Sequence, residues 1–204
     1  MQTDPLLHPR GSALARRILA MLGWRLEFEG LPALQGVIVV YPHTSNWDFP
    51  VGLLAKWGMG LQVKFWGKHT LFRIPLFGAF LRWVGGVPVD KTAAHGAVEQ
   101  MVDAFAQKRQ DGQYFWLALA PEGTRSWRPA WRSGFYRITL QAQVPLMVAL
   151  LDYGRKRIRL IDVMMLTGRV PEDMGRIAQL LEGSRGLRAD QASPIQLQES
   201  KGGS

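Results

Sequence analysis

The sequence predicts a single α/β domain with a partly parallel mixed sheet flanked by helices. Short apolar strands alternate with amphipathic helices along most of the chain, and this alternation is typical of parallel strands joined by crossover helices. The chain has 204 residues, of which 47% are hydrophobic. That length and composition are enough for one substantial core and too little for two large domains.

The predicted strands are short runs rich in β-branched and aromatic residues, bounded by turn-forming residues. They lie at residues 37–41, 61–66, 87–89, 114–120, 145–151 and 158–165. The predicted helices have apolar side chains at helical spacing. They lie at residues 49–57, 71–84, 92–110, 134–143 and 172–181. Pro75 falls early in the second of these helices, where proline is tolerated.

Three parts are expected along the chain: a membrane-associated segment at residues 1–30, the domain at 31–188, and a loose tail at 189–204. In the first part, Leu14 and Ile18 belong to a helically spaced apolar series with arginines nearby, as in an interfacial amphipathic helix. A helix that packs against the core fits the same series equally well. The tail has too little apolar surface to offset the entropy of ordering it.

Charge and cysteine content limit the chemistry that the chain can perform. The formal net charge of +9 favours an anionic partner, such as phospholipid, nucleotide or nucleic acid. The chain contains no cysteine, which excludes a thiolate nucleophile, a disulfide and a cysteine-based metal site. No run of about 18 apolar residues occurs, so we expect no membrane-spanning helix.

His43 stands out among the four histidines because Asp48 follows it five positions later, where a strand gives way to a helix. A turn at this point brings the carboxylate to the imidazole. The carboxylate would then orient the ring and stabilise imidazolium, leaving the second nitrogen free to take a proton from a hydroxyl. On its own, the pattern is explained more simply as a loop histidine followed by a helix cap.

A second polar cluster, Pro121-Glu122-Gly123-Thr124-Arg125, follows the predicted strand at 114–120. It combines a carboxylate, a flexible glycine, a hydroxyl and a permanent cation in one turn, which suits a phosphate or similar anion. Functional groups gather at the carboxyl ends of strands in α/β sheets, and both polar clusters occupy such positions. A turn with a structural salt bridge remains the alternative.

Taken together and in order, these segments resemble the glycerolipid acyltransferase family that includes bacterial 1-acylglycerol-3-phosphate acyltransferases. The family's His-x4-Asp block is matched by residues 43–48, and its Glu-Gly-Thr-Arg block by residues 122–125. Between them, residues 68–78 are similar to a block in which lysine precedes Ile-Pro-x-Phe-Gly. Residues 86–91 (GVPVDK), 131–134 (WRSG) and 144–146 (VPL) continue the pattern.

Two departures from the family pattern affect other parts of the chain. Val148 stands where the fourth block usually has a second proline, which alters the expected wall facing the acyl chain. The stretch before His43 is short, so the two-helix membrane anchor of some family members is expected to be reduced or missing. Neither departure involves the proposed acid–base pair.

The resemblance implies direct acyl transfer from acyl-CoA or acyl carrier protein to a hydroxyl of a lysophospholipid, with 1-acylglycerol-3-phosphate as the leading acceptor in phospholipid biosynthesis. It implies that His43 and Asp48 are catalytic, and that the substrate is bound by Lys68, Glu122, Gly123, Thr124 and Arg125. Lys68 and Arg125 would hold the acceptor's phosphate, and Glu122 would shape that site or bind an acceptor hydroxyl. No cofactor or metal is expected.

The expected partners also include an anionic membrane surface. The resemblance to bacterial enzymes implies a peripheral or monotopic protein at the cytoplasmic face of the inner (plasma) membrane. One alternative keeps the chemistry but uses a phosphate-free acceptor, such as an amino-acid lipid precursor. Another is a non-catalytic module that binds anionic lipid or nucleic acid. That module would leave the ordered family blocks unexplained, and we therefore expect no nucleic-acid partner.

Overall fold

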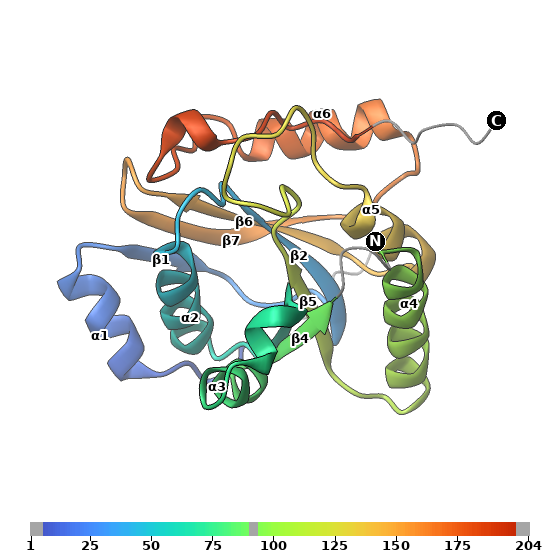
Figure 1. The fold of residues 1–204 in the computed structure, drawn as a ribbon, viewed down its shortest axis with the longest axis horizontal. Helices are drawn as coiled ribbons and strands as arrows, with labels where there is room; N and C mark the ends of the chain where they lie inside the picture. The colour runs from blue at the N-terminus through green and yellow to red at the C-terminus, as the bar shows by residue number, and fades with distance from the viewer. Residues whose placement is uncertain (1–5, 90–93, 199–204) are drawn as a thin grey trace.

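The computed structural model describes residues 6–89 and 94–198 of the chain. Its centre is a seven-stranded sheet in the order β1-β7-β6-β2-β5-β3-β4 (Figure 1). The strands are β1 Arg25–Phe28, β2 Gln35–Tyr41, β3 Val63–Lys68, β4 Gly86–Val89, β5 Phe115–Leu119, β6 Leu146–Asp152 and β7 Arg157–Met164. Every neighbouring pair is parallel except β6 with β7. The prediction of a partly parallel mixed sheet in an α/β fold is confirmed.

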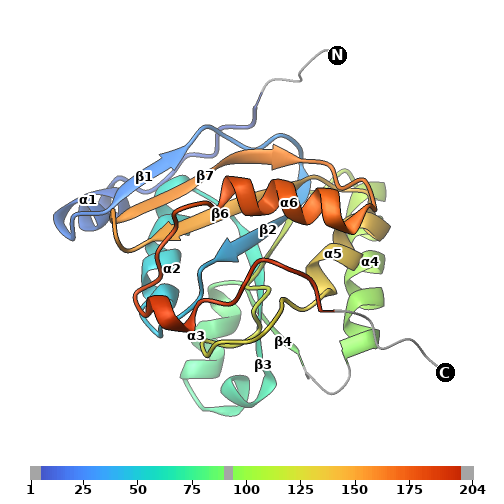
Figure 2. The same ribbon diagram turned by 90° about the horizontal axis from the view of Figure 1, so that it is seen from above.

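Helices cover both faces of this sheet, as Figures 1 and 2 show. The α-helices are α1 Ala13–Met21, α2 Asp48–Met59, α3 Phe77–Trp83, α4 Ala94–Gln110, α5 Gly134–Ala142 and α6 Val170–Leu180. Two short 3-10 helices, η1 His69–Arg73 and η3 Ala189–Gln191, complete the described elements. Asp90, Lys91 and Thr92, which carry part of the family pattern and the predicted start of α4, lie outside the described residues, as do residues 1–5 and 199–204.

The period-two alternation of the strands divides the hydrophobic core into two layers. In β2, Val37 and Val39 face a layer that includes side chains of α4, α5 and α6, whereas Ile38 faces a layer that includes side chains of α1 and α2. The central strand β6 is buried throughout, as expected for a strand covered on both faces. The sheet is therefore a rigid base for the loops at its edges.

The single helix predicted at residues 71–84 is wrong. The chain forms η1, then an extended residue at Ile74 and a turn at Pro75 and Leu76, and only then α3. Proline has no backbone N–H to continue the turn of η1, and Leu76 has a positive φ of 60°, which is not helical. The apolar spacing that suggested a helix therefore comes from two separate short elements. β1 was not predicted, because its four residues form a half-buried edge strand.

The prediction of a loose tail from Ala189 is wrong for residues 189–198. Ser193 is fully buried, Leu197 pairs with Trp131 in an isolated bridge, and Ile195 packs against the core. Hydrogen bonds to the loops of the domain order this segment, and composition alone gave no sign of them. Figure 2 shows the segment crossing the molecule in front of β2.

The N-terminal helix α1 has one buried and one exposed side. Ala15 and Leu19 are buried, with Leu19 in the core layer that includes α2, whereas Leu14 and Met21 are exposed. The helix therefore packs on the domain and still presents apolar side chains to its surroundings. Among the described residues, no helix has both the length and the apolar character needed to cross a membrane.

Removing the Trp131 side chain should cost the fold much of its stability. It is fully buried, with its ring against those of Tyr41 and Phe135. We expect Trp131→Ala to lower the free energy of unfolding by about 3–5 kcal/mol, because it leaves a large cavity. Trp127→Ala, at a half-exposed site four residues away, should change it by less than about 0.5 kcal/mol. Urea denaturation compares the two, and equal effects would contradict this packing.

Candidate active site

The candidate site lies at one edge of the sheet, where several parallel strands end side by side. Strands β6, β2, β5 and β3 are consecutive neighbours and mutually parallel, so their carboxyl ends share that edge. His43 follows β2, Glu122 follows β5, Lys68 ends β3 and Tyr153 follows β6. The topology therefore brings together residues that are far apart in the sequence.

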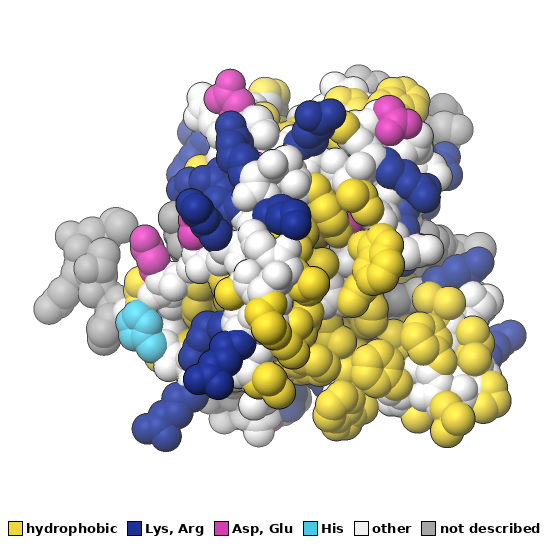
Figure 3. Space-filling model, turned by 90° about the vertical axis from the view of Figure 1, so that its left-hand side faces the viewer, with side chains coloured by type: hydrophobic (Ala, Val, Ile, Leu, Met, Phe, Trp, Pro, Cys, Tyr) yellow, Lys and Arg dark blue, Asp and Glu magenta, His cyan; other side chains and the backbone are white. Residues whose placement is uncertain are grey.

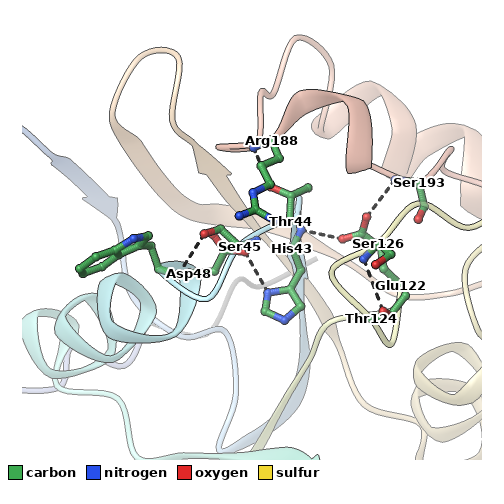
Figure 4. A network of polar contacts seen from close by, with 10 residues as sticks. His43, Thr44, Ser45, Asp48, Glu122, Thr124, Ser126, Arg188 and Ser193 are labelled. Atoms are coloured by element: carbon green, nitrogen blue, oxygen red, sulfur yellow. Dashed lines mark hydrogen bonds and ion pairs between the residues drawn. The ribbon is translucent and has the colours of Figure 1, made fainter.

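His43 and Asp48 form the pair that the sequence predicted. The His43 Nδ1 and Asp48 Oδ2 atoms are 3.1 Å apart, and Figure 4 shows the imidazole ring beside the first turn of α2. Asp48 is the first residue of that helix and is buried. The His43 side chain keeps 22% of its surface exposed, so a substrate can reach the ring. This is the geometry of a base with an orienting carboxylate.

The environment of Asp48 keeps its carboxylate ionised. Burial alone would raise the pKa of this group, but hydrogen bonds from His43 and from the Ser45 N–H, at 2.8 Å, outweigh burial and lower it. Asp48 also lies in the first turn of α2, where the helix dipole favours negative charge. A charged carboxylate at this position stabilises imidazolium on His43.

Tyr153 is a second buried neighbour of Asp48. Burial, together with the nearby Asp48 charge, raises the pKa of the Tyr153 hydroxyl above its ordinary value. Neither this hydroxyl nor Asp48 Oδ1 has a hydrogen bond of standard geometry within the described residues. The Tyr153 hydroxyl therefore stays protonated and lies beside the Asp48 carboxylate.

Glu122 links the loop that carries His43 to two other parts of the chain. Only 1% of its surface is exposed. One carboxylate oxygen accepts the His43 N–H at 2.6 Å, and the other accepts the Ser193 N–H at 2.9 Å (Figure 4). Burial raises the pKa of this carboxyl, while the two N–H donors and His43 act in the opposite direction. Glu122 thus holds the backbone of His43 in place.

The turn after Glu122 requires the glycine that the sequence provides. Gly123 has a φ of 65°, and a Cβ added there would lie 2.7 Å from Nε of Arg132. Thr124 is half-buried and its hydroxyl accepts the Ser126 N–H at 3.4 Å. The backbone bond from Arg132 N–H to the Pro121 oxygen, at 2.9 Å, closes the turn. The turn is therefore compact, and the Arg132 side chain lies closely against Gly123.

Lys68 and Arg125, the two predicted phosphate-binding cations, are exposed. Lys68 ends β3, and Arg125 follows the turn after β5, so both lie on neighbouring strands of the edge that carries His43. Within residues 6–89 and 94–198, neither forms an ion pair with a carboxylate, and no hydrogen bond joins either to His43 or Asp48. Both cations are therefore available to an anionic ligand. Over the same ranges, no three His, Asp or Glu side chains could jointly hold a metal ion.

The segment after α6 contacts the candidate site in ways that sequence reasoning missed. The Arg188 N–H donates to the hydroxyl of Thr44 at 3.2 Å, and Thr44 is fully buried next to His43 (Figure 4). A Cβ on Gly186 would lie only 2.5 Å from the same hydroxyl oxygen. The Tyr153 N–H donates to the oxygen of Arg185 at 2.8 Å. These contacts connect the His43 loop and the loop after β6 to the segment after α6.

The fold and the site together define a class of α/β protein that carries a histidine–carboxylate pair at the carboxyl edge of its sheet. The Acyltransferase family model matches residues 25–150, which is more than half of the chain. The chain belongs to this acyltransferase family.

Comparison with individual proteins adds one solved structure. The chain is similar to the crystal structure of the 1-acyl-sn-glycerophosphate (LPA) acyltransferase PlsC from Thermotoga maritima. The two share 19% sequence identity over 82% of this chain and 73% of that chain, with a TM-score of 0.49. No curated protein matches the chain at a significant level.

The close packing of Gly186 against Thr44 predicts that an alanine at this position impairs the site. The added methyl must displace either the segment after α6 or the His43 loop, and we expect Gly186→Ala to lower turnover by about 100-fold. Gly175→Ala on α6, where a Cβ meets nothing within 4 Å, serves as the control. It should leave turnover unchanged and stabilise the helix by about 0.5–1 kcal/mol. Full activity in Gly186→Ala would show that the segment does not position His43.

Proposed function

We propose that this protein transfers a fatty acyl group from an acyl thioester, either acyl-CoA or acyl carrier protein, to the hydroxyl of a lysophospholipid. The observation that carries the proposal is the 3.1 Å contact between His43 Nδ1 and the buried, ionised Asp48 carboxylate. Membership of the acyltransferase family supports the reaction class. The exposed cations Lys68 and Arg125 at the same edge support a phosphate-bearing acceptor, with 1-acylglycerol-3-phosphate as the leading candidate.

In this mechanism, His43 is the general base. Its Nδ1–H donates to Asp48, which leaves Nε2 to take the proton of the acceptor hydroxyl as the oxygen attacks the thioester carbonyl. A C–O bond forms, the C–S bond breaks, and the proton moves from His43 to the departing thiolate. Asp48 remains ionised throughout and stabilises the imidazolium. The acyl group passes directly to the acceptor without a covalent acyl-enzyme.

The turn from Glu122 to Arg125 and the end of β3 form the proposed acceptor site. Glu122 positions the His43 backbone, and Gly123 and Thr124 shape the compact turn from which Arg125 projects. Arg125 and Lys68 would bind the acceptor's phosphate from two neighbouring strands. Two cations of this kind suit a phosphate group, because a guanidinium and an ammonium together donate several charge-assisted hydrogen bonds.

We further propose that the protein works in phospholipid biosynthesis as a peripheral or monotopic protein at the cytoplasmic face of the inner (plasma) membrane. Its acceptor and its product are both lipids of a bilayer. The exposed apolar side chains of α1 and the net charge of +9 support contact with an anionic membrane surface.

The direct test is an assay of the purified protein with a radiolabelled acyl donor and a panel of lyso-acceptors. We expect labelled diacyl product from 1-acylglycerol-3-phosphate. His43→Ala should lower turnover by about 100- to 10,000-fold with an unchanged circular dichroism spectrum, because it removes only the base. The control is His8→Ala, at an exposed histidine far from the site in sequence. Full turnover in His43→Ala would refute the proposed mechanism.

The phosphate assignment predicts a selective effect of the two exposed cations. Lys68→Gln and Arg125→Gln should each raise KM for 1-acylglycerol-3-phosphate about tenfold or more, because each removes a charge-assisted contact. The same variants should change KM for a phosphate-free lyso-acceptor by less than twofold. Arg176→Gln, at an exposed position on α6, controls for the lost charge. Equal losses with both acceptors would contradict a phosphate site at these residues.

A further inference from the structure

The carboxylate of Asp48 has one oxygen that His43 and Ser45 do not use. Asp48 Oδ2 accepts the Ser45 N–H at 2.8 Å and lies 3.1 Å from His43 Nδ1. Asp48 Oδ1 is buried and, in the described part of the chain, has no hydrogen bond of standard geometry. An ionised carboxylate can accept about four hydrogen bonds, and a buried oxygen without a donor is costly. The second oxygen of Asp48 therefore calls for one more donor.

The Tyr153 hydroxyl is the neighbouring group that can supply this donor. Its oxygen is buried as well and, over the described residues, likewise has no hydrogen bond of standard geometry. Burial, followed by its interaction with the Asp48 carboxylate, raises the pKa of this hydroxyl, so it keeps its proton. One buried group can only accept and the other can donate. The Tyr153 hydroxyl and Asp48 Oδ1 can therefore satisfy each other.

The turn between β6 and β7 holds Tyr153 in place from several sides. The Tyr153 N–H donates to the Arg185 oxygen at 2.8 Å. Its ring meets the ring of the buried Trp24 edge-on, with centroids 4.8 Å apart. In the same turn, the side chain of Lys156 donates to the Leu22 oxygen at 3.0 Å. The phenol ring is therefore fixed by the fold before any substrate binds.

The donor beside Asp48 is a neutral group, although cations are plentiful on the same side of the molecule. The β6–β7 turn and α1 lie on the side that Figure 3 shows, where Lys and Arg side chains are prominent and Asp and Glu are few. Among the ion pairs of the described residues, Asp48 has only His43 as a partner. A cation on Oδ1 would compensate the charge that imidazolium needs. A phenol orients the carboxylate and leaves that charge in place.

We propose that Tyr153 is a positioning residue whose hydroxyl donates to Asp48 Oδ1 and thereby keeps Oδ2 against His43 Nδ1. This role rests on the proposed function, because Tyr153 acts on the base of the same reaction. Rotation of a carboxyl group about its Cβ–Cγ bond is soft, so a carboxylate held through one oxygen can turn. Donors on both oxygens fix its plane. The fixed carboxylate then holds the ring proton on Nδ1 and leaves Nε2 free to act as the base.

A double-mutant cycle tests whether Tyr153 acts through Asp48. Tyr153→Phe removes only the hydroxyl, and it should lower kcat about tenfold while KM for both substrates changes by less than about twofold. Asp48→Ala has no carboxylate to orient, so adding Tyr153→Phe to it should lower kcat by less than about a further twofold. The matched control is Tyr114→Phe. Tyr114 packs against the same core layer with its hydroxyl also buried, and its removal should leave kcat unchanged.

Nitrogen-15 NMR of the His43 ring tests the same role without turnover. In Tyr153→Phe, the fraction of neutral ring protonated on Nε2 should rise at least about threefold, and in Tyr114→Phe it should stay as in wild type. An unchanged kcat or tautomer ratio in Tyr153→Phe overturns the proposal. So does an equal loss of kcat in the wild-type and Asp48→Ala backgrounds, because Tyr153 would then act only on the fold. If the tautomer ratio shifts as expected but the wild-type protein transfers no acyl group, the positioning role stands and the proposed function fails.

Discussion

The site depends on the buried carboxylate of Glu122, which accepts one backbone N–H from His43 and one from Ser193. These two bonds join the loop after β2, the turn after β5 and the segment after α6 at a single side chain. Burying a carboxylate costs free energy, and hydrogen bonds to both of its oxygens offset that cost. Both bonds form only while the three segments keep their relative positions. The position of His43 is therefore coupled to the packing of residues more than 140 positions later in the chain.

Two buried carboxylates near His43 have contrasting environments. Asp48 lies at the start of α2 and accepts hydrogen bonds from His43 and Ser45, so its pKa is lowered despite burial. Glu122 is buried more completely, and there burial prevails and its pKa is raised. The group with the lowered pKa is the one that must stay charged to stabilise imidazolium. Glu122 instead holds the backbone of neighbouring segments, because its two carboxylate oxygens accept hydrogen bonds from backbone N–H groups.

Much of the fold was readable from the sequence because its strands and helices have strong periodicity. The apolar run at residues 37–41 and the amphipathic pattern before Gln110 correspond to β2 and α4. His43 and Asp48 were found because they are close in sequence and span a strand-to-helix turn. Glu122 was found as part of a polar turn, although its contact with the His43 N–H could not be foreseen.

The features that sequence reasoning missed depend on contacts between distant segments. Tyr153 meets Asp48 because β6 lies beside β2, and strand order is not encoded in local periodicity. The segment at residues 189–198 is polar, and hydrogen bonds and limited packing hold it rather than a strong apolar pattern. The break at Pro75 was missed because apolar residues at helical spacing lie on both sides of it. In the structure, Pro75 and the positive φ of Leu76 separate η1 from α3.

The proposed mechanism requires a particular protonation of the neutral His43 ring, and nitrogen-15 NMR of labelled protein measures that property directly. In the neutral ring, the proton should reside on Nδ1, toward Asp48, leaving Nε2 unprotonated and free to act as the base. In Asp48→Asn, this tautomer preference should weaken. A neutral His43 protonated on Nε2 in the wild-type protein would contradict the proposed role of the pair.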